Sequence, residues 1–383
     1  MAPRMAGAAP RVGRLGVSVP GGVRSVDRGS ARGDVLRVAL VGCGERGEGC
    51  STAIARTSNM RLALTMDAEP ARAEDLARRF NVPWTASFEE VLASDSVDAV
   101  VICTPHHLHA GQVAAAAGAG KHVIVEKPIA TSLDSAVMAV EAARRTGVHV
   151  SVNLSYRYFP HIQEARSLIK AGVLGDLFGV SLVFQTERFS DYWEGHTGRT
   201  ASDWRMRREL SGGGILINML FHHLDLMRFL PGEEIVEVAC THATLENPGE
   251  VEDSVALWVR YERGAVGTVN ASTCVRGADV VEFRLWGRDG HLSLTPPFQF
   301  YSLRIVDGRR PGRWHAVAGR RGVRQRDVEY FERTARCILK GDPPEVTAGD
   351  GLAVQALTDA AYRSAQTGQA VRVEGGPWTT AAS

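Results

Sequence analysis

Two hydrophobic patterns divide the chain. Between Leu36 and Asn153, short apolar runs alternate with segments of helical period, whereas between Phe178 and Gly287 apolar and polar residues mostly alternate one by one. The first pattern is typical of parallel strands that helices bury on both faces, and the second of antiparallel strands with one solvated face. The sequence therefore predicts an α/β protein in which a doubly wound parallel sheet precedes an α+β domain with a large open, mostly antiparallel sheet.

A glycine-rich turn follows the first apolar run. The run over 37–41 leads into Gly42-Cys-Gly-Glu-Arg-Gly47, and a segment of helical period comes next. Glycine at these positions allows a tight turn, close approach of the backbone to a pyrophosphate and close packing of helix on strand. The positive end of the helix also favours an anion. The turn predicts a Rossmann-type dinucleotide site that includes Gly42, Gly44, Glu45, Arg46 and Gly47.

The second strand ends in an acid. The run over 61–67 closes on Asp67, twenty residues after Gly47, where a carboxylate can accept hydrogen bonds from the ribose hydroxyls of an adenosine. A turn residue that ends a strand is the plainer alternative. A carboxylate at this point would repel a 2'-phosphate, so we expect NAD rather than NADP as the cofactor.

The run His122-Val-Ile-Val125 ends abruptly in Glu126, Lys127 and Pro128. Open parallel sheets bind their ligands at the carboxyl ends of the strands, so these charges lie where an active site is expected. An ammonium that loses hydration there acquires a lower pKa and can act as a general acid or base. The alternative is a surface lysine that follows a strand.

Four segments together resemble the Gfo/Idh/MocA family of nicotinamide-dependent oxidoreductases, named after glucose-fructose oxidoreductase, inositol dehydrogenase and a rhizopine catabolism protein. In chain order they are Val38-Ala-Leu-Val-Gly-Cys-Gly-Glu-Arg-Gly47, Cys103-Thr-Pro-His-His-Leu-His109, Glu126-Lys-Pro128 and Ser211-Gly-Gly-Gly-Ile-Leu-Ile-Asn-Met-Leu-Phe-His-His-Leu-Asp225. The resemblance extends over residues 35 to 372. It implies that Glu126 and Lys127 contribute to the cofactor site and that Lys127 is catalytic.

The resemblance also assigns the loop after the strand over 97–103. Thr104, Pro105, His106 and His109 are expected to contact the cofactor phosphate or nicotinamide, although the family usually has Asn where His106 stands. Histidines this close together could bind a metal ion. We discount a metal site because no acidic or thiolate residue has the spacing to complete it.

The segment Ser211-Gly-Gly-Gly214 is expected to open one helix that carries Asn218, His222 and Asp225. Residues four apart share a helix face, so Asn218 and His222 could bind the same substrate hydroxyl. Many relatives have Asp where Asn218 stands, and an amide cannot accept that proton. Proton transfer then falls to His222 and Lys127, and His222 is expected to titrate during catalysis. His223 is interpreted as a core histidine.

Two further segments were assigned less directly. The resemblance places Asn153 and Arg157 near the nicotinamide, although Arg157 could equally begin a helix. A polar, aromatic segment over 191–205 is too long for a turn, and we expect it to line the substrate site. Its candidate ligands are Asp191, His196, Arg199 and Arg205.

These assignments set the domain boundaries. We expect residues 35–155 to form the NAD-binding domain, residues 156–372 to form the domain for substrate binding and oligomerisation, and residues 373–383 to form a loose tail. Residues 1–34 are rich in Gly, Arg, Ala and Pro and lack hydrophobic periodicity, so we expect a disordered extension. An organelle transit peptide and an overlong start, with Met5 as the initiator, are the alternatives.

Composition and charge limit the possible partners. A net charge of +1 without a basic face argues against nucleic acid, and no apolar run is long enough to cross a membrane. The six cysteines are scattered and lack metal-site spacing, which suits a reducing cytoplasm.

The sequence thus predicts an NAD-dependent dehydrogenase or reductase that acts on a CH–OH group of a sugar, polyol or cyclitol. By resemblance it should be a homodimer or homotetramer that pairs through the C-terminal sheet. One alternative is a glycosidase that retains NAD and oxidises its substrate only transiently. The other is a non-catalytic regulator that binds the nucleotide.

Overall fold

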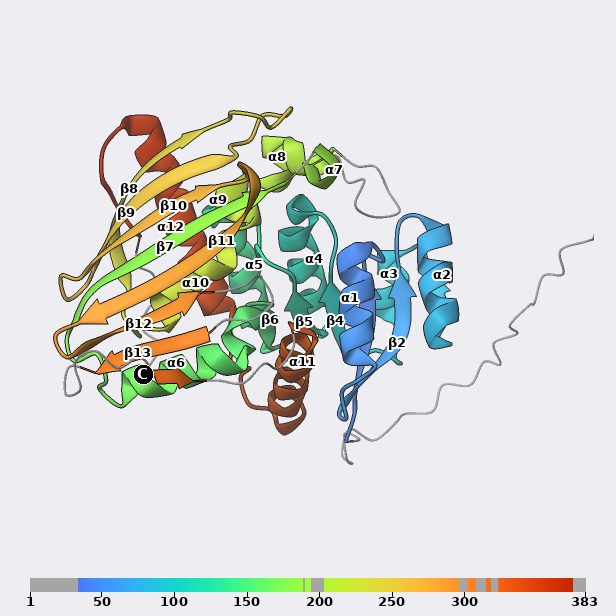
Figure 1. Ribbon diagram of the computed structural model, residues 1–383. Helices are drawn as coiled ribbons and strands as arrows, with labels where there is room; N and C mark the ends of the chain where they lie inside the picture. Colours follow the sequence, from blue (N-terminus) through green and yellow to red (C-terminus); the bar gives the residue numbers. More distant parts are fainter. Residues whose placement is uncertain are drawn as a thin grey trace, which may run out of the picture. The chain divides into compact units, whose positions relative to one another are not determined.

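The computed structural model describes residues 34–188, 190–193, 203–295, 302–307, 315–317 and 323–374 (Figure 1). The expected N-terminal extension, apart from Asp34, lies outside these residues, as does the tail beyond Glu374. Among the described helices, none is both long and apolar enough to cross a membrane.

The N-terminal half is a parallel sheet of six strands in the order β3-β2-β1-β4-β5-β6. Its central strands are buried because they consist almost entirely of Val, Ile, Leu and Ala, as the apolar runs predicted. The strands are β1 (Leu36–Val41), β2 (Met60–Met66), β3 (Trp84–Thr85), β4 (Ala99–Ile102), β5 (His122–Val125) and β6 (Val150–Val152). The helices between them are α1 (Glu45–Ile54), α2 (Pro70–Phe80), α3 (Phe88–Ala93), α4 (His106–Gly118) and α5 (Leu133–Thr146).

The C-terminal half contains a sheet of nine strands in the order β14-β13-β12-β11-β7-β10-β9-β8-β15. Among the described strands of this sheet, β7 and β10 pair in parallel and the other pairs are antiparallel, so the prediction of an α/β chain with a mostly antiparallel second sheet is confirmed. The strands are β7 (Leu177–Glu187), β8 (Ile235–Ala243), β9 (Ser254–Tyr261), β10 (Val266–Ser272), β11 (Cys274–Gly287), β12 (Gly290–Thr295), β13 (Ser302–Asp307), β14 (His315–Val317) and β15 (Val371–Arg372). The sequence did not predict strands β12, β13, β14 and β15.

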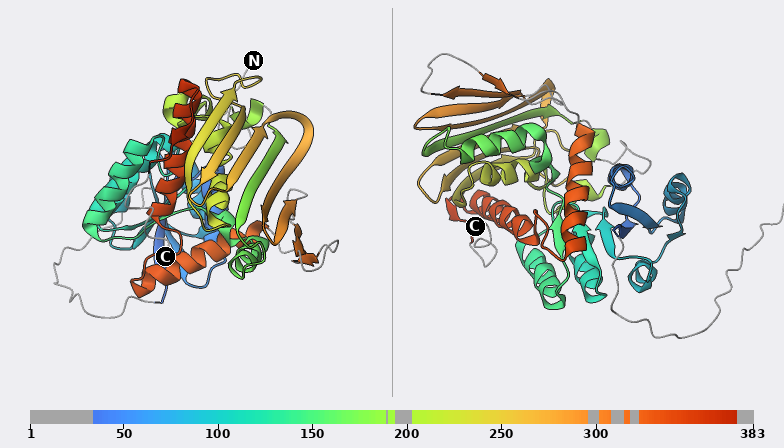
Figure 2. Two further views of the ribbon diagram at one scale, coloured as in Figure 1. Left: turned by 90° about the vertical axis from the view of Figure 1, so that its left-hand side faces the viewer. Right: turned by 90° about the horizontal axis from the view of Figure 1, so that it is seen from below.

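Helices from the C-terminal half complete the packing of both sheets (Figure 2). Helix α12 packs on β8 and on α5, whereas α11 returns to α1 in the first half. These helices are η1 (Ser155–Tyr158), α6 (Pro160–Lys170), α7 (Ser190–Trp193), η2 (Trp204–Met206), α8 (Arg208–Ser211), α9 (Ile215–Asn218), α10 (Phe221–Phe229), α11 (Val323–Lys340) and α12 (Ala348–Thr367).

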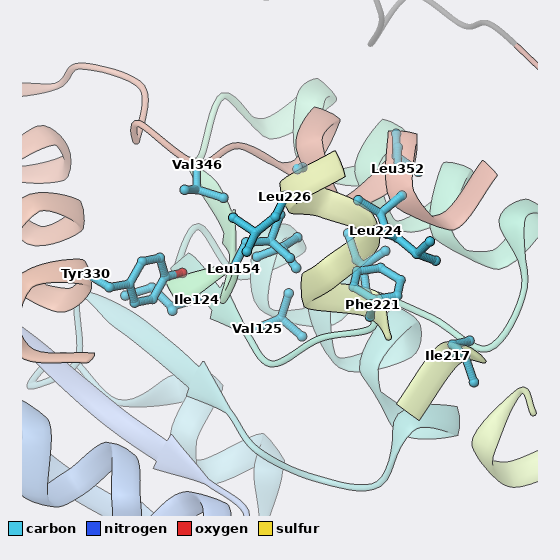
Figure 3. Close-up of a cluster of buried hydrophobic side chains, with 14 of the residues drawn as sticks. Ile124, Val125, Leu154, Ile217, Phe221, Leu224, Leu226, Tyr330, Val346 and Leu352 are labelled. Atoms are coloured by element: carbon cyan, nitrogen blue, oxygen red, sulfur yellow. The ribbon is translucent and has the colours of Figure 1, made fainter. Parts of the chain in front are cut away.

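The core runs without interruption from the first sheet into these helices (Figure 3). Ile124 of β5 lies in the same buried cluster as Phe221 of α10 and Tyr330 of α11. The Tyr330 hydroxyl is hydrogen-bonded at 2.8 Å to the Ser151 hydroxyl on β6. The segments that carry the predicted site are therefore held on a shared rigid base.

Candidate active site

The glycine-rich turn has the geometry that a pyrophosphate needs. Gly42 has a φ of +94°, and a Cβ there would lie 2.7 Å from the carbonyl carbon of Cys103. A Cβ on Gly47 would lie 2.0 Å from the Gly42 oxygen, so neither position accepts a side chain. Gly44, the N-cap of α1, has no atom within 4 Å of such a Cβ and makes no side-chain cap. The first turn of α1, including Glu45, therefore presents main-chain N–H groups to an anion.

Asp67 lies at the carboxyl end of β2 beside this turn. Its buried carboxylate accepts hydrogen bonds from the main-chain N–H groups of Cys43, at 2.7 Å, and Glu69, at 2.9 Å. The Arg72 guanidinium approaches to 3.9 Å. Asp67 thus fixes the turn and occupies the position predicted for the residue that binds the ribose.

Glu126 links the turn to the end of β6. Its buried carboxylate accepts a hydrogen bond from Arg46 Nε at 2.6 Å and another from Asn153 Nδ2 at 2.7 Å. Arg46 also lies 3.2 Å from Asp327 of α11. Asp327 lies 281 residues from Arg46 in the chain, so no local signal in the sequence could link the two residues.

A group of metal-ligand type lies beneath the turn. Among the described residues, one such group has its donor atoms within 4.8 Å of one another, and it consists of Cys50, Cys103 and Glu126. The Cys103 hydrogen bond and burial raise the pKa of Cys50 well above its usual value, so it remains a thiol. The Arg46 guanidinium already occupies the Glu126 carboxylate. The donor set therefore does not fit a metal cation.

Lys127 follows β5, and its ammonium donates a hydrogen bond to the main-chain oxygen of Asn218. Burial lowers the pKa of Lys127 to about 8. The Glu126 carboxylate opposes this shift, while Arg46 and Arg205 add to it. Lys127 therefore exchanges a proton near neutral pH, as a general acid or base must.

His222 lies near Lys127 and stacks on Tyr156, with the rings 4.1 Å apart and 4° from parallel. Its Nδ1 is buried and lacks a hydrogen-bond partner among the described residues. Burial, and then the charge of Lys127, lowers the pKa of His222 well below its usual value. This shift favours the neutral ring near neutral pH and argues against the expectation that His222 titrates during catalysis. Its neighbour His223 packs between Tyr156 and Phe184.

The single helix expected after the glycines is two helices. Helix α9 ends at Asn218 and α10 begins at Phe221, so Asn218 and His222 do not share a regular helix face. The Asn218 amide donates to the main-chain oxygens of Gly213, at 2.7 Å, and Gly214, at 3.2 Å. Asn218 thus holds Lys127 through its carbonyl while its amide supports the glycine segment.

Arg157 lies in a buried ion-pair network. Its guanidinium donates to Asp225 at 2.8 Å and 2.5 Å and to Asp350 at 2.8 Å, and it covers the Phe229 ring. These contacts join η1, α10 and α12. These contacts give Arg157 a structural role with Asp225 as its partner, and its predicted contact with the cofactor stays a prediction.

The loop after β4 is held by its histidines. His109 lies 2.6 Å from the Pro128 oxygen and 2.8 Å from the Thr104 oxygen, which leaves neither ring nitrogen for the cofactor. His106 Nδ1 lies 2.8 Å from the Ser211 oxygen, and burial lowers its pKa. Both rings thus shape the Thr104-Pro105 loop, whose own contact with the cofactor stays a prediction.

Part of the predicted substrate segment is described. His196, Arg199 and the Asp191 side chain lie outside the described residues. Arg205 is half-buried, with its guanidinium 4.6 Å from the Trp204 ring. Trp204 packs edge-on against His106 at 4.5 Å.

Two contributors had not been identified from the sequence. Tyr156, which belongs to η1, stacks on the His222 ring. The Arg326 guanidinium lies 4.6 Å from the Tyr156 ring. Arg326 lies in the first turn of α11. Neither residue belongs to a motif, so only the packing of α11 on η1 reveals them.

The residues present fit a nicotinamide dinucleotide. Its pyrophosphate suits the first turn of α1, where Gly44 leaves open space beside the main-chain N–H groups. Its adenosine ribose suits Asp67. The unpartnered His222 Nδ1 and the Lys127 ammonium are polar groups left for the reacting end.

The chain is similar in sequence and fold to known dehydrogenases. The chain is 30% identical to scyllo-inositol 2-dehydrogenase (NAD(+)) of Bacillus subtilis, over 64% of this chain and 70% of that protein. It is 28% identical to inositol 2-dehydrogenase of Rhizobium meliloti, over 86% of this chain and 96% of that protein. The fold matches levoglucosan dehydrogenase in complex with NADH, with a TM-score of 0.80, 24% identity and coverage of 89% of this chain and 100% of that one.

Two family profiles match the two halves of the chain. Residues 36–154 match the oxidoreductase family with an NAD-binding Rossmann fold, and residues 162–293 match the GFO/IDH/MocA C-terminal domain. The chain therefore belongs to the Gfo/Idh/MocA family of NAD-binding oxidoreductases.

Proposed function

We propose that the protein transfers a hydride between NAD and a secondary hydroxyl or carbonyl group of a sugar, polyol or cyclitol. The observation that carries the proposal is Lys127, which lies at the carboxyl edge of the first sheet, has a pKa lowered by burial to about 8, and acts electrostatically on His222. The inositol and levoglucosan dehydrogenases named among its relatives support this class of substrate.

The protein's own residues would bind and move the proton. Bound NAD supplies the redox chemistry. Lys127 in its neutral form takes the proton of the substrate hydroxyl, and the Asn218 carbonyl holds the Nζ atom in place. The neutral His222 ring forms a hydrogen bond with the same hydroxyl through Nδ1, and the stacked Tyr156 fixes the ring plane.

A screen of sugars, polyols and inositols with NAD and NADP tests the proposal. We expect stoichiometric NADH formation and a kcat/KM preference for NAD on the order of 10², because Asp67 would repel a 2'-phosphate. Asp67→Ala should narrow that preference. Substrate turnover without net NADH would indicate the glycosidase chemistry instead, and nucleotide binding without any turnover would indicate a regulator.

We propose further that two copies pair through the outer face of the nine-stranded sheet. Trp258, Val266, Val280 and Trp286 are between 36% and 44% exposed on its central strands. Trp286 lies over Gly179, where an added Cβ would be 2.2 Å from its ring. Apolar side chains gathered on one face are typical of an interface.

Light scattering tests the pairing. The native chain should have at least twice the mass of one chain, and Trp286→Asp should shift it toward the monomer. Leu245→Asp changes an exposed leucine outside these strands and serves as the control. A native monomer, or equal masses for both variants, would contradict this interface.

A further inference from the structure

Cationic side chains outnumber carboxylates around the proposed hydroxyl site. The cations whose charge acts on Lys127 or on His222, together with Lys127 itself, are Arg46, Lys127, Arg205 and Arg326. The carboxylates that contact them are Glu126 and Asp327. Counted over the described residues, four cations and two carboxylates leave a net charge of +2 when Lys127 is protonated.

Both carboxylates already form ion pairs with arginines. Arg46 lies 2.6 Å from Glu126 and 3.2 Å from Asp327, and Arg326 lies 3.4 Å from the second oxygen of Asp327. Arg205 has no carboxylate within ion-pair distance among the residues that the structure describes. Its guanidinium instead lies 4.6 Å from the Trp204 ring and 5.5 Å from the Tyr192 ring. Of the three arginines, Arg205 is thus the one without a counter-charge in the described part of the chain.

Arg205 lies on the substrate side of the sheet. Trp204 packs against His106, which follows β4, and Arg205 acts electrostatically on Lys127, which follows β5. The glycine-rich turn and Asp67 follow β1 and β2. A dinucleotide places its pyrophosphate on the N-terminus of the helix after β1, whereas the contacts of Arg205 lie at the strand ends after β4 and β5.

The aromatic rings also restrict how Arg205 can bind. The Arg205 side chain also forms a hydrogen bond with Tyr192, which uses one of its five N–H donors, and the remaining donors can match the two oxygens of a carboxylate. We propose that Arg205 binds a carboxylate of the substrate, so that the substrate is a sugar acid or a related polyhydroxy acid. This inference rests on the proposed function, because it places the anion beside the hydroxyl that Lys127 serves.

Calorimetry on the NADH-loaded full chain tests the inference. The probes are D-glucuronate with D-glucose, D-galacturonate with D-galactose, and D-glucose 6-phosphate. We expect at least one acid to bind on the order of 10 to 100 times more tightly than its neutral partner, as hydrogen bonds to a charged group provide. Arg205→Gln should remove that difference and Arg205→Lys restore part of it, with NADH affinity unchanged in both. Arg207→Gln, an exposed arginine nearby, is the control.

Several results would overturn the inference: equal binding within every pair, no binding by either acid, an unaltered difference in Arg205→Gln, or a preference for the sugar phosphate. A parallel loss of NADH affinity would assign Arg205 to the cofactor and also overturn it. NADH formation measured on the same probes judges the proposed function separately. Acid-selective binding without turnover supports the inference and contradicts the function, whereas turnover of neutral sugars alone does the reverse.

Discussion

Replacing Lys127 by methionine should lower kcat by on the order of 10² to 10⁴ while the fold and the affinity for NAD stay nearly unchanged. Methionine retains the apolar stem but removes the group that exchanges the proton and donates to the Asn218 carbonyl. Steady-state rates measure the loss, and melting temperature and NADH titration show whether the protein is intact. Lys127→Arg should be equally inactive, because a guanidinium keeps its proton. A methionine variant with nearly normal kcat would show that Lys127 has a structural role and is not catalytic.

Lys127 should also set the pH dependence of kcat/KM. Burial lowers the pKa of Lys127 from its usual 10.5 to about 8, so the neutral amine that accepts a proton predominates only above about pH 8. For oxidation of the alcohol, kcat/KM should rise with pH through this value and then level off. In the reductive direction the ammonium is the proton donor, so the rate should fall over the same range. Lys127→Met should remove this limb from the residual activity.

The sequence predicts those parts of the site whose residues are close together in the chain. The first strand, the glycine-rich turn and Asp67 lie within one βαβ unit, in which the turn and the strand ends have fixed relations. Glu126 and Lys127 were placed correctly at the sheet edge for a similar reason, because a fully apolar strand immediately precedes them.

The contacts that the sequence did not reveal join distant segments. Arg46 pairs with Asp327 across 281 residues, and Arg157 pairs with Asp350 across 193. Arg157 shows the ambiguity well, since a polar residue after a sheet strand can face a ligand or a buried partner with equal ease. The break between Asn218 and Phe221 occurs without Gly or Pro, so tertiary packing overrides a pattern that favours one helix.

Replacing His222 by phenylalanine should lower kcat/KM by about 10², the usual effect of removing one buried hydrogen-bonding group from a reacting oxygen. Phenylalanine preserves the stack on Tyr156 but removes the unpartnered Nδ1. His223→Phe is the matched control, because His223 lies between Tyr156 and Phe184 in the core, and it should lose less than about tenfold.

The pH profile of this variant separates the two roles. Burial and the charge of Lys127 keep His222 neutral, so His222→Phe should retain the rising limb near pH 8 at a lower rate. If His222 were instead the base, the limb would disappear in His222→Phe and persist in Lys127→Met. That result would overturn the assignment of proton transfer to Lys127. A larger loss of kcat/KM from His223→Phe than from His222→Phe would overturn the contact proposed between His222 and the substrate hydroxyl.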